Sequence, residues 1–286
     1  MRWQGRRRSS NVEDLRGSSG NRALRVGGGL SGIGVLIALA YLFLGGNPAE
    51  VGRIFQGAPS YSVESGQELT EAEKEMGEFV STVLADLEDV WQKEFRQMGL
   101  TYEEPALVLF SGAVETAAGY ASASTGPFYS PADSKVYIDL TFFEEMQRQL
   151  NAPGDFALAY VLAHEVGHHV QNLLGINEKV MSQRNRMSEK EFNRLLVRLE
   201  LQADFLAGVW AHYARQIPDY LEATDIEEGL NAASAVGDDR IMKQSQGYVV
   251  PDAFTHGTSE QRVRWFRKGL ETGDINQGDT FGAARL

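Results

Sequence analysis

The chain has 286 residues, a formal net charge of -12 and no cysteine. Its first 25 residues hold seven arginines against Glu13 and Asp14, about +5, which leaves the remainder near -17 by subtraction. A body this acidic argues against nucleic-acid binding. The lack of cysteine excludes a disulfide framework and a thiolate zinc site, so any zinc must be held by His, Asp or Glu. The length allows one large domain or two small ones with a sizeable core.

An arginine-rich segment and an uncharged stretch open the chain. Residues 1–25 are polar and are expected to form a disordered, cytoplasmic basic tail. Residues 26–46 carry no charge, and about 21 such residues can cross a bilayer core as a helix. Because the arginines precede this stretch, the positive-inside rule predicts that the bulk of the chain is exported. A cleaved signal peptide is the alternative, but its apolar region should be shorter and end in an Ala-x-Ala-like site. Gly28 and Gly32 could pack two such helices into a homodimer.

Residues 47–67 have the composition of a linker, and the predicted catalytic domain follows over residues 68–286. Thr70 and Glu73 match a capping box, and apolar residues at helical spacing predict a helix that ends at Gly99. Residues 106–110 predict a short strand. After a small-residue stretch up to residue 126, residues 128–129 and 135–140 predict a β-hairpin. Its edge could hold an extended peptide by strand addition, or it could be a purely structural sheet edge.

Residues 160–170 contain the pattern His-Glu-x-x-His. On a helix, His164 and His168 lie one turn apart on the same face, where they can bind one Zn²⁺ and leave positions for a third ligand and a water. Glu165 can then act as the general base that deprotonates the zinc-bound water. The alternative is a helix with two histidines on a polar face, but the flanking residues are apolar, and buried polar side chains need partners. Gly167 weakens a helix by about 1 kcal/mol relative to alanine, which indicates close approach of a substrate or a second helix.

A further helix is predicted from the capping box at Ser188 to about Arg215. It carries Glu200 and Asp204 four residues apart, on a face flanked by leucine and alanine. Two half-buried carboxylates on one face are unfavourable unless a cation or hydrogen bonds compensate them. We therefore assign Glu200 as the third zinc ligand, and Asp204 as the carboxylate that accepts an N–H from a zinc-bound histidine and fixes its tautomer. The alternatives are the reverse assignment and a solvated acidic face.

The C-terminal part is predicted to contain a helix over residues 224–247 and another after the capping box at Thr258. Asp238 is expected in a surface ion pair, although it could also support the site. His256 lies in the loop just before the last helix. A histidine there could stabilise the oxyanion that forms when a peptide carbonyl is attacked, or it could be structural. His169 is expected to be structural.

Several of these segments together resemble a known family, the neutral zinc metallopeptidases of bacteria, or YpfJ-like family. The resemblance rests on HEVGHHVQ (164–171), ELQAD (200–204), GPFY (126–129), VYIDL (136–140), HGTS (256–259), MRWQGRR (1–7) and NVED (11–14). It implies a zincin fold of the gluzincin kind, in which a Glu-x-x-x-Asp helix supplies the third ligand, and a bacterial inner-membrane protein. It does not supply a substrate.

The chain departs from the family pattern in its cysteines. Family members often have cysteine at the positions of Ala118, Ser130, Phe205 and Gly278, and all four are absent here. Their joint absence is what the loss of two disulfides would look like. The departure leaves the zinc residues intact.

The sequence therefore predicts an α+β, mainly helical, zincin-like metallopeptidase domain with a small β-sheet, preceded by one transmembrane helix. The predicted function is a zinc-dependent endopeptidase of peptide or protein substrates. It would be anchored in the bacterial inner membrane by residues 26–46, with the catalytic domain in the periplasm. One alternative is a membrane-tethered zinc-binding scaffold, in which Asp204 would complete a closed site of four protein ligands. Another is a zinc hydrolase that acts on a non-protein bond.

Overall fold

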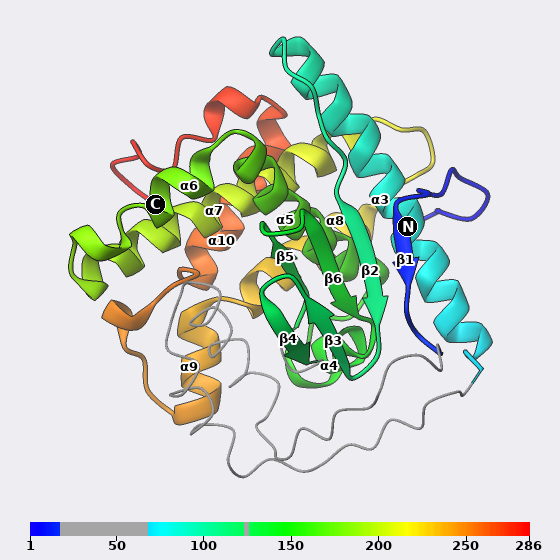
Figure 1. Cartoon of the computed structure of the whole chain (residues 1–286), viewed down its shortest axis with the longest axis horizontal. Helices are drawn as coiled ribbons and strands as arrows, with labels where there is room; N and C mark the ends of the chain where they lie inside the picture. Colours follow the sequence, from blue (N-terminus) through cyan, green and yellow to red (C-terminus); the bar gives the residue numbers. More distant parts are fainter. Residues whose placement is uncertain (18–67, 123–125) are drawn as a thin grey trace.

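Helices build most of the fold, and a small sheet lies against them (Figure 1). The computed structural model describes residues 1–17, 68–122 and 126–286. The helices are α3 (Glu71–Gln97), α4 (Thr141–Gln149), α5 (Asp155–Leu173), α6 (Ile176–Met181), α7 (Glu189–Ala214), α8 (Ala223–Ala235), α9 (Asp238–Gln246) and α10 (Ser259–Thr272). The strands are β1 (Val12–Asp14), β2 (Ala106–Phe110), β3 (Ala113–Thr116), β4 (Gly119–Ser122), β5 (Phe128–Ser130) and β6 (Lys135–Asp139). The mainly helical α+β class predicted from the sequence agrees with this arrangement.

The main sheet has the strand order β1-β2-β6-β5. β1, β2 and β6 run parallel, whereas β5 pairs antiparallel with β6 and forms the predicted hairpin, in which Tyr129 lies opposite Val136. Strands β3 and β4 form a separate hairpin that the sequence analysis missed. Its segment is rich in small residues and lacks a hydrophobic alternation. A substrate-binding role for the edge strand β5 stays a prediction.

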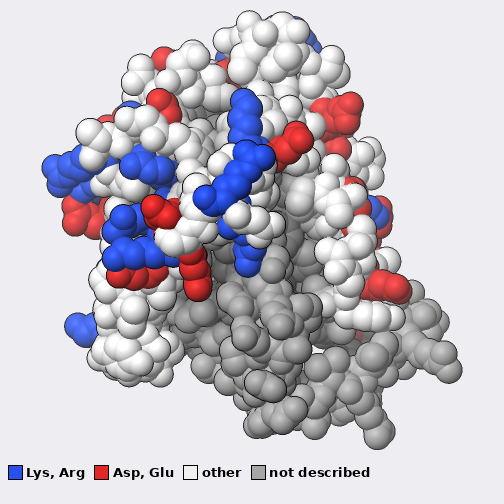
Figure 2. All heavy atoms as spheres, turned by 60° about the vertical axis from the view of Figure 1, so that its left-hand side comes forward, with Lys and Arg blue, Asp and Glu red and all other residues white. Residues whose placement is uncertain are grey.

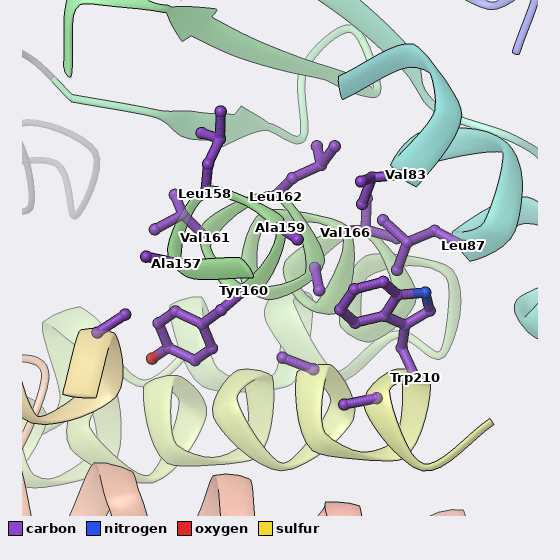
Figure 3. Packing of buried hydrophobic residues seen from close by; sticks show 14 of the residues in the cluster. Val83, Leu87, Ala157, Leu158, Ala159, Tyr160, Val161, Leu162, Val166 and Trp210 are labelled. Carbon is purple, nitrogen blue, oxygen red and sulfur yellow. The ribbon is translucent and has the colours of Figure 1, made fainter. Parts of the chain in front are cut away.

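Helix α5 lies at the centre of the core, with apolar neighbours on several sides (Figure 3). Leu158 and Leu162 point toward the sheet, and Val166 lies close to Val83 and Leu87 of α3 (Figure 3). Full burial of one such side chain contributes about 1.5–3 kcal/mol, so this helix is strongly fixed in place. The helix that carries His-Glu-x-x-His is therefore a rigid platform for those side chains.

The capping boxes predicted from the sequence are present at Thr70, Ser188 and Thr258. The single helix predicted over residues 224–247 is wrong, because the chain forms α8 and α9 with a break at Gly237. A Cβ atom at Gly237 would lie 2.3 Å from the backbone nitrogen of Ser259, so this position must approach the start of α10 closely. The break matters for the site, because it directs Asp238 inward.

The first 17 residues belong to the folded domain, in contrast to the disordered tail expected for residues 1–25. Strand β1 pairs with β2 over three residues, and Trp3 is buried against Phe79 of α3. Arg6 pairs with Asp86 at 2.9 Å and Arg7 with Glu88 at 3.0 Å. Ion pairs with α3 thus account for Arg6 and Arg7 of this arginine-rich segment. Residues 18–25 lie outside the described residues.

The predicted single-pass membrane architecture needs correction. Within the ranges that the structure describes, no helix is long and apolar enough to cross a membrane. The expected span at residues 26–46 and the linker at 47–67 lie outside those ranges. In addition, one crossing at residues 26–46 would separate residues 1–17 from residues 68–286 by a bilayer, whereas β1 and β2 share one sheet. The prediction of a cytoplasmic N-terminus, an inner-membrane anchor and a periplasmic catalytic domain is therefore wrong, and a homodimer through that helix loses its basis.

Charged side chains of both signs lie next to one another on the face shown in Figure 2. Among the exposed ion pairs are Lys190 with Asp252 at 2.7 Å and Arg8 with Glu78 at 2.6 Å. Exposed pairs of this kind contribute about 0–1 kcal/mol each. The absence of nucleic-acid binding, inferred from the acidic composition, stays a prediction.

Candidate metal centre

The site is built where helices α5 and α7 cross. A Cβ atom at Gly167 would lie only 3.0 Å from the carbonyl oxygen of Ala203 and 3.2 Å from its Cα, so the second helix predicted near this glycine is α7. His164 and His168 lie three residues before and one residue after Gly167. Glu200 and Asp204 occupy the same positions relative to Ala203. Because side chains three or four residues apart share a helix face, the crossing brings the two pairs together.

The three predicted ligands, His164, His168 and Glu200, converge at this crossing. Nε2 of His164 lies 3.2 Å from Nε2 of His168 and 3.2 Å from Oε2 of Glu200, and Nε2 of His168 lies 3.5 Å from Oε1 of Glu200. Zinc bonds to nitrogen and oxygen of about 2.0–2.1 Å place tetrahedral ligand atoms about 3.3–3.4 Å apart. The three side chains therefore fit three corners of a zinc tetrahedron.

The charges around these ligands also favour a cation. Burial disfavours a charged imidazole at His164, but the carboxylates of Asp204 and Glu200 outweigh it and raise the pKa of His164 to about 9. Burial likewise opposes the charge of Glu200, yet His168 and His256 hold the pKa of this carboxyl well below its usual range. Two carboxylates thus stabilise positive charge at the imidazoles, which a divalent ion would supply.

Asp204 supports His164 and is not one of the three converging side chains. Its Oδ1 lies 2.9 Å from Nδ1 of His164 and accepts a hydrogen bond from the Tyr160 hydroxyl at 2.5 Å. Arg262 donates to both carboxylate oxygens at 2.8 Å. Burial alone would raise the pKa of Asp204, but Arg262 and His164 lower it to about 2. The arrangement fits the predicted role of Asp204, which is to fix the tautomer and orientation of a ligand histidine.

Glu165 lies beside the ligands but is held by the sheet. Its Oε2 accepts a hydrogen bond of 2.9 Å from the backbone N–H of Tyr129 in β5. Burial raises the pKa of Glu165, while His164 and His168 act in the opposite direction. A carboxylate with a raised pKa is a better proton acceptor near neutral pH than an exposed one.

His256 reaches the site from the loop before α10. Its Nδ1 lies 3.1 Å from Oδ1 of Asp238. Burial lowers the pKa of His256, but the charges of Asp238 and Glu200 outweigh this effect and raise it. The other oxygen of Asp238 accepts backbone N–H groups of residues 255, 256 and 257 at 2.7–3.0 Å. Asp238 is therefore buried and holds this loop in place. The prediction that it lies mainly in a surface ion pair is wrong.

Neither the role of Arg262 nor that of the Tyr160 hydroxyl beside Asp204 was predicted from the sequence. Arg262 occupies the first position of a buried stripe on α10 that continues with Trp265, Phe266, Gly269 and Leu270. An arginine in line with an apolar stripe was the available signal that it needs a buried partner. His169 is structural, as expected, because its ring bonds the Tyr129 hydroxyl and the carbonyl of Glu103.

Another acidic group in the described residues consists of Asp155, Asp225 and Glu228. The α-amino group of Met1 lies 3.0 Å from Asp155 and 3.2 Å from Asp225. This ammonium group supplies the positive charge that the carboxylates need, so a metal is not required to explain the cluster.

Two histidines one turn apart, a glutamate between them and a carboxylate from a second helix define the zinc hydrolases of the His-Glu-x-x-His class. A family model described as "Putative neutral zinc metallopeptidase" matches residues 1–281. The chain belongs to this family of neutral zinc metallopeptidases, as the resemblance in the sequence had indicated.

Two relatives show how far the similarity extends. "Uncharacterized protein YpfJ" of Escherichia coli K12 is 48% identical over 287 residues, which cover 99% of each chain. "Uncharacterized protein Rv2575" of Mycobacterium tuberculosis H37Rv is 46% identical over 195 residues, which cover 65% of each chain. No solved structure matches the chain.

Proposed function

We propose that this protein is a zinc-dependent endopeptidase whose zinc ligands are His164, His168 and Glu200. The observation that carries the proposal is the convergence of these side chains: the two Nε2 atoms lie 3.2 Å apart, and each lies 3.2–3.5 Å from one carboxylate oxygen of Glu200. Membership of the neutral zinc metallopeptidase family supports zinc and peptide substrates. Three protein ligands leave a tetrahedral position open, which is the property of a catalytic rather than a structural zinc site.

The protein side chains would divide the chemistry between them. A bound zinc ion would polarise the peptide carbonyl and acidify a water molecule. Glu165 accepts the proton of that water and passes it to the leaving amine, a role favoured by its raised pKa. His256, whose ring is oriented by Asp238, donates a hydrogen bond to the oxygen that becomes negative during attack. Asp204 holds His164 in the orientation in which Nε2 faces His168 and Glu200.

The geometry favours this function over a closed, structural zinc site. A scaffold protein with four ligands would need Asp204 at the metal. The carboxylate of Asp204 already engages Arg262, Tyr160 and Nδ1 of His164, and both of its oxygens receive hydrogen bonds. Its engagement argues against a fourth protein ligand from this residue.

Hydrolysis of a general protein substrate tests the proposal. The purified full chain is incubated with casein, with and without a chelator, and the chelated sample is then resupplied with zinc. We expect cleavage that the chelator abolishes and zinc restores, since a bound zinc ion would both activate the attacking water and polarise the substrate carbonyl. Cleavage that persists after complete removal of zinc would contradict the proposal.

Replacement of His256 by alanine is expected to lower kcat by about 100- to 1,000-fold, the usual effect of removing one oxyanion donor. Zinc content should stay unchanged, because His256 is not a ligand. The matched control is His169→Gln, which alters a histidine of the zinc helix that bonds to Tyr129 and Glu103 instead. Its kcat per folded molecule should stay near that of the wild type. An unchanged kcat in His256→Ala would reduce His256 to a structural residue.

A further inference from the structure

A chain of side-chain amides leads from His168 to the C-terminal segment. Nδ1 of His168 lies 2.9 Å from Oε1 of Gln171. Nε2 of Gln171 donates to the carbonyl of Leu199 at 2.7 Å and to Oε1 of Gln202 at 3.1 Å. Nε2 of Gln202 in turn donates to the carbonyl of Gly278 at 3.0 Å. The two glutamines therefore connect one candidate zinc ligand with a segment 110 residues away in the sequence.

The two backbone carbonyls that this series of hydrogen bonds contacts fix which groups donate and which accept. The backbone carbonyls of Leu199 and Gly278 can only accept hydrogen bonds, so each must face an amide N–H₂ group. The oxygen of Gln202 then faces the amide of Gln171, and the oxygen of Gln171 faces His168. Because that oxygen only accepts, Nδ1 of His168 must carry the proton. In the neutral ring, which is the form that binds a metal, Nε2 is then left with its lone pair toward His164 and Glu200.

Burial makes the alternative orientation costly. Gln171 is fully buried at 0% exposure. If its amide were reversed, its oxygen would oppose the carbonyl of Leu199, and a buried polar group without a partner costs about 1–3 kcal/mol. The opposite His168 tautomer would place two acceptors against each other, at a similar cost.

The far end of this series of hydrogen bonds, at Gly278, is also held firmly. Thr280 donates to the carbonyl of Arg198 at 2.6 Å, and the Arg198 guanidinium donates to the carbonyls of Phe281 and Ala283 at 3.1 Å. These contacts dock residues 278–283 on α7. The carbonyl of Gly278 is therefore a fixed acceptor for Gln202.

We propose that Gln171 and Gln202 are positioning residues that select the Nδ1-protonated tautomer of His168, and that the C-terminal segment thereby contributes to metal affinity. The second part of this inference rests on the proposed zinc site. The two candidate histidine ligands would then be supported differently. His164 has the charged carboxylate of Asp204, whereas His168 has a neutral amide anchored on the backbone.

The test uses Gln171→Met, which keeps the side-chain length but removes both hydrogen-bonding groups. The first readout is the ¹⁵N chemical shifts of the His168 ring in the metal-free full chain, which report the tautomer directly. We expect Nδ1 to be protonated in the wild type and the two tautomers to mix in Gln171→Met. The second readout is the zinc Kd by competition with a chromophoric chelator, which should rise about 10- to 100-fold.

Gln202→Met tests the remote link at a half-buried position and gives a second variant if Gln171→Met does not fold. It should weaken zinc binding by about 2- to 10-fold. The double variant should bind zinc no more weakly than Gln171→Met alone, because both changes break the same chain, whereas independent packing defects would add. An unchanged His168 tautomer in both variants would overturn the proposal, as would additive effects on Kd. A wild-type protein that does not bind zinc would instead refute the zinc site. The tautomer measurement would still decide the role of the two glutamines.

Discussion

Replacement of Glu165 by glutamine is expected to lower kcat for peptide hydrolysis by about 100- to 10,000-fold while zinc stays bound. Glutamine has nearly the same shape and can still accept the hydrogen bond from Tyr129 N–H, but it cannot take a proton from water. The measurement combines kcat and KM on a peptide substrate with elemental analysis of the same sample. KM should change little, since the altered step is proton transfer.

Glu165→Asp provides the control for this prediction. Aspartate keeps a basic carboxylate but shortens its reach, so activity should fall less than with glutamine if basicity is the essential property. If zinc disappears together with activity in Glu165→Gln, the role of Glu165 is to hold the metal site and not to act as the base. Full activity in that variant would also contradict the assignment.

Replacement of Asp204 by leucine is expected to reduce the free energy of unfolding by about 3–5 kcal/mol, because it leaves the Arg262 guanidinium buried without a counter-charge. Arg262 is only 4% exposed, and Asp204 is fully buried. The same change removes the support of His164 and should weaken zinc binding by about 10- to 100-fold. Urea unfolding of the metal-free protein measures the stability effect separately from the effect of zinc.

The double variant Asp204→Leu with Arg262→Met separates charge burial from packing. It removes both charges, so it should be more stable than Asp204→Leu alone. Zinc binding should remain weak, since His164 still lacks its carboxylate. A double variant that is less stable than the single one would show that Arg262 contributes through contacts other than the ion pair with Asp204.

Local patterns were sufficient to predict the elements that carry the candidate ligands. The capping boxes at Ser188 and Thr258 locate the starts of α7 and α10 because each satisfies the free N–H groups of its helix with two side chains. The spacing of His164 and His168, and that of Glu200 and Asp204, places each pair on one helix face. Gly167 indicated a close approach, and at this position a Cβ atom would lie only 3.0 Å from the carbonyl oxygen of Ala203.

Contacts between segments that are distant in the sequence could not be predicted from such local patterns. The membrane anchor was predicted from residues 1–46 alone, whereas β1 within this region pairs with β2, about 95 positions away in the sequence. Arg262 and Asp238 enter the site through the close packing of α10 on α7 and the break at Gly237. At Gly208, a Cβ atom would lie 2.1 Å from the carbonyl oxygen of Phe266, so α10 packs closely on α7, and Arg262 of α10 lies beside Asp204 of α7.

The measurement that tests the central claim most directly is the zinc content of the full chain, wild type and Glu200→Ala, by elemental analysis after exhaustive dialysis. The proposed site predicts one zinc per wild-type chain and its loss or strong depletion in Glu200→Ala, because two histidines alone leave the ion weakly held. Full zinc retention in Glu200→Ala, at wild-type affinity, would contradict Glu200 as the third ligand. A wild-type chain that binds no zinc would contradict the metal centre itself.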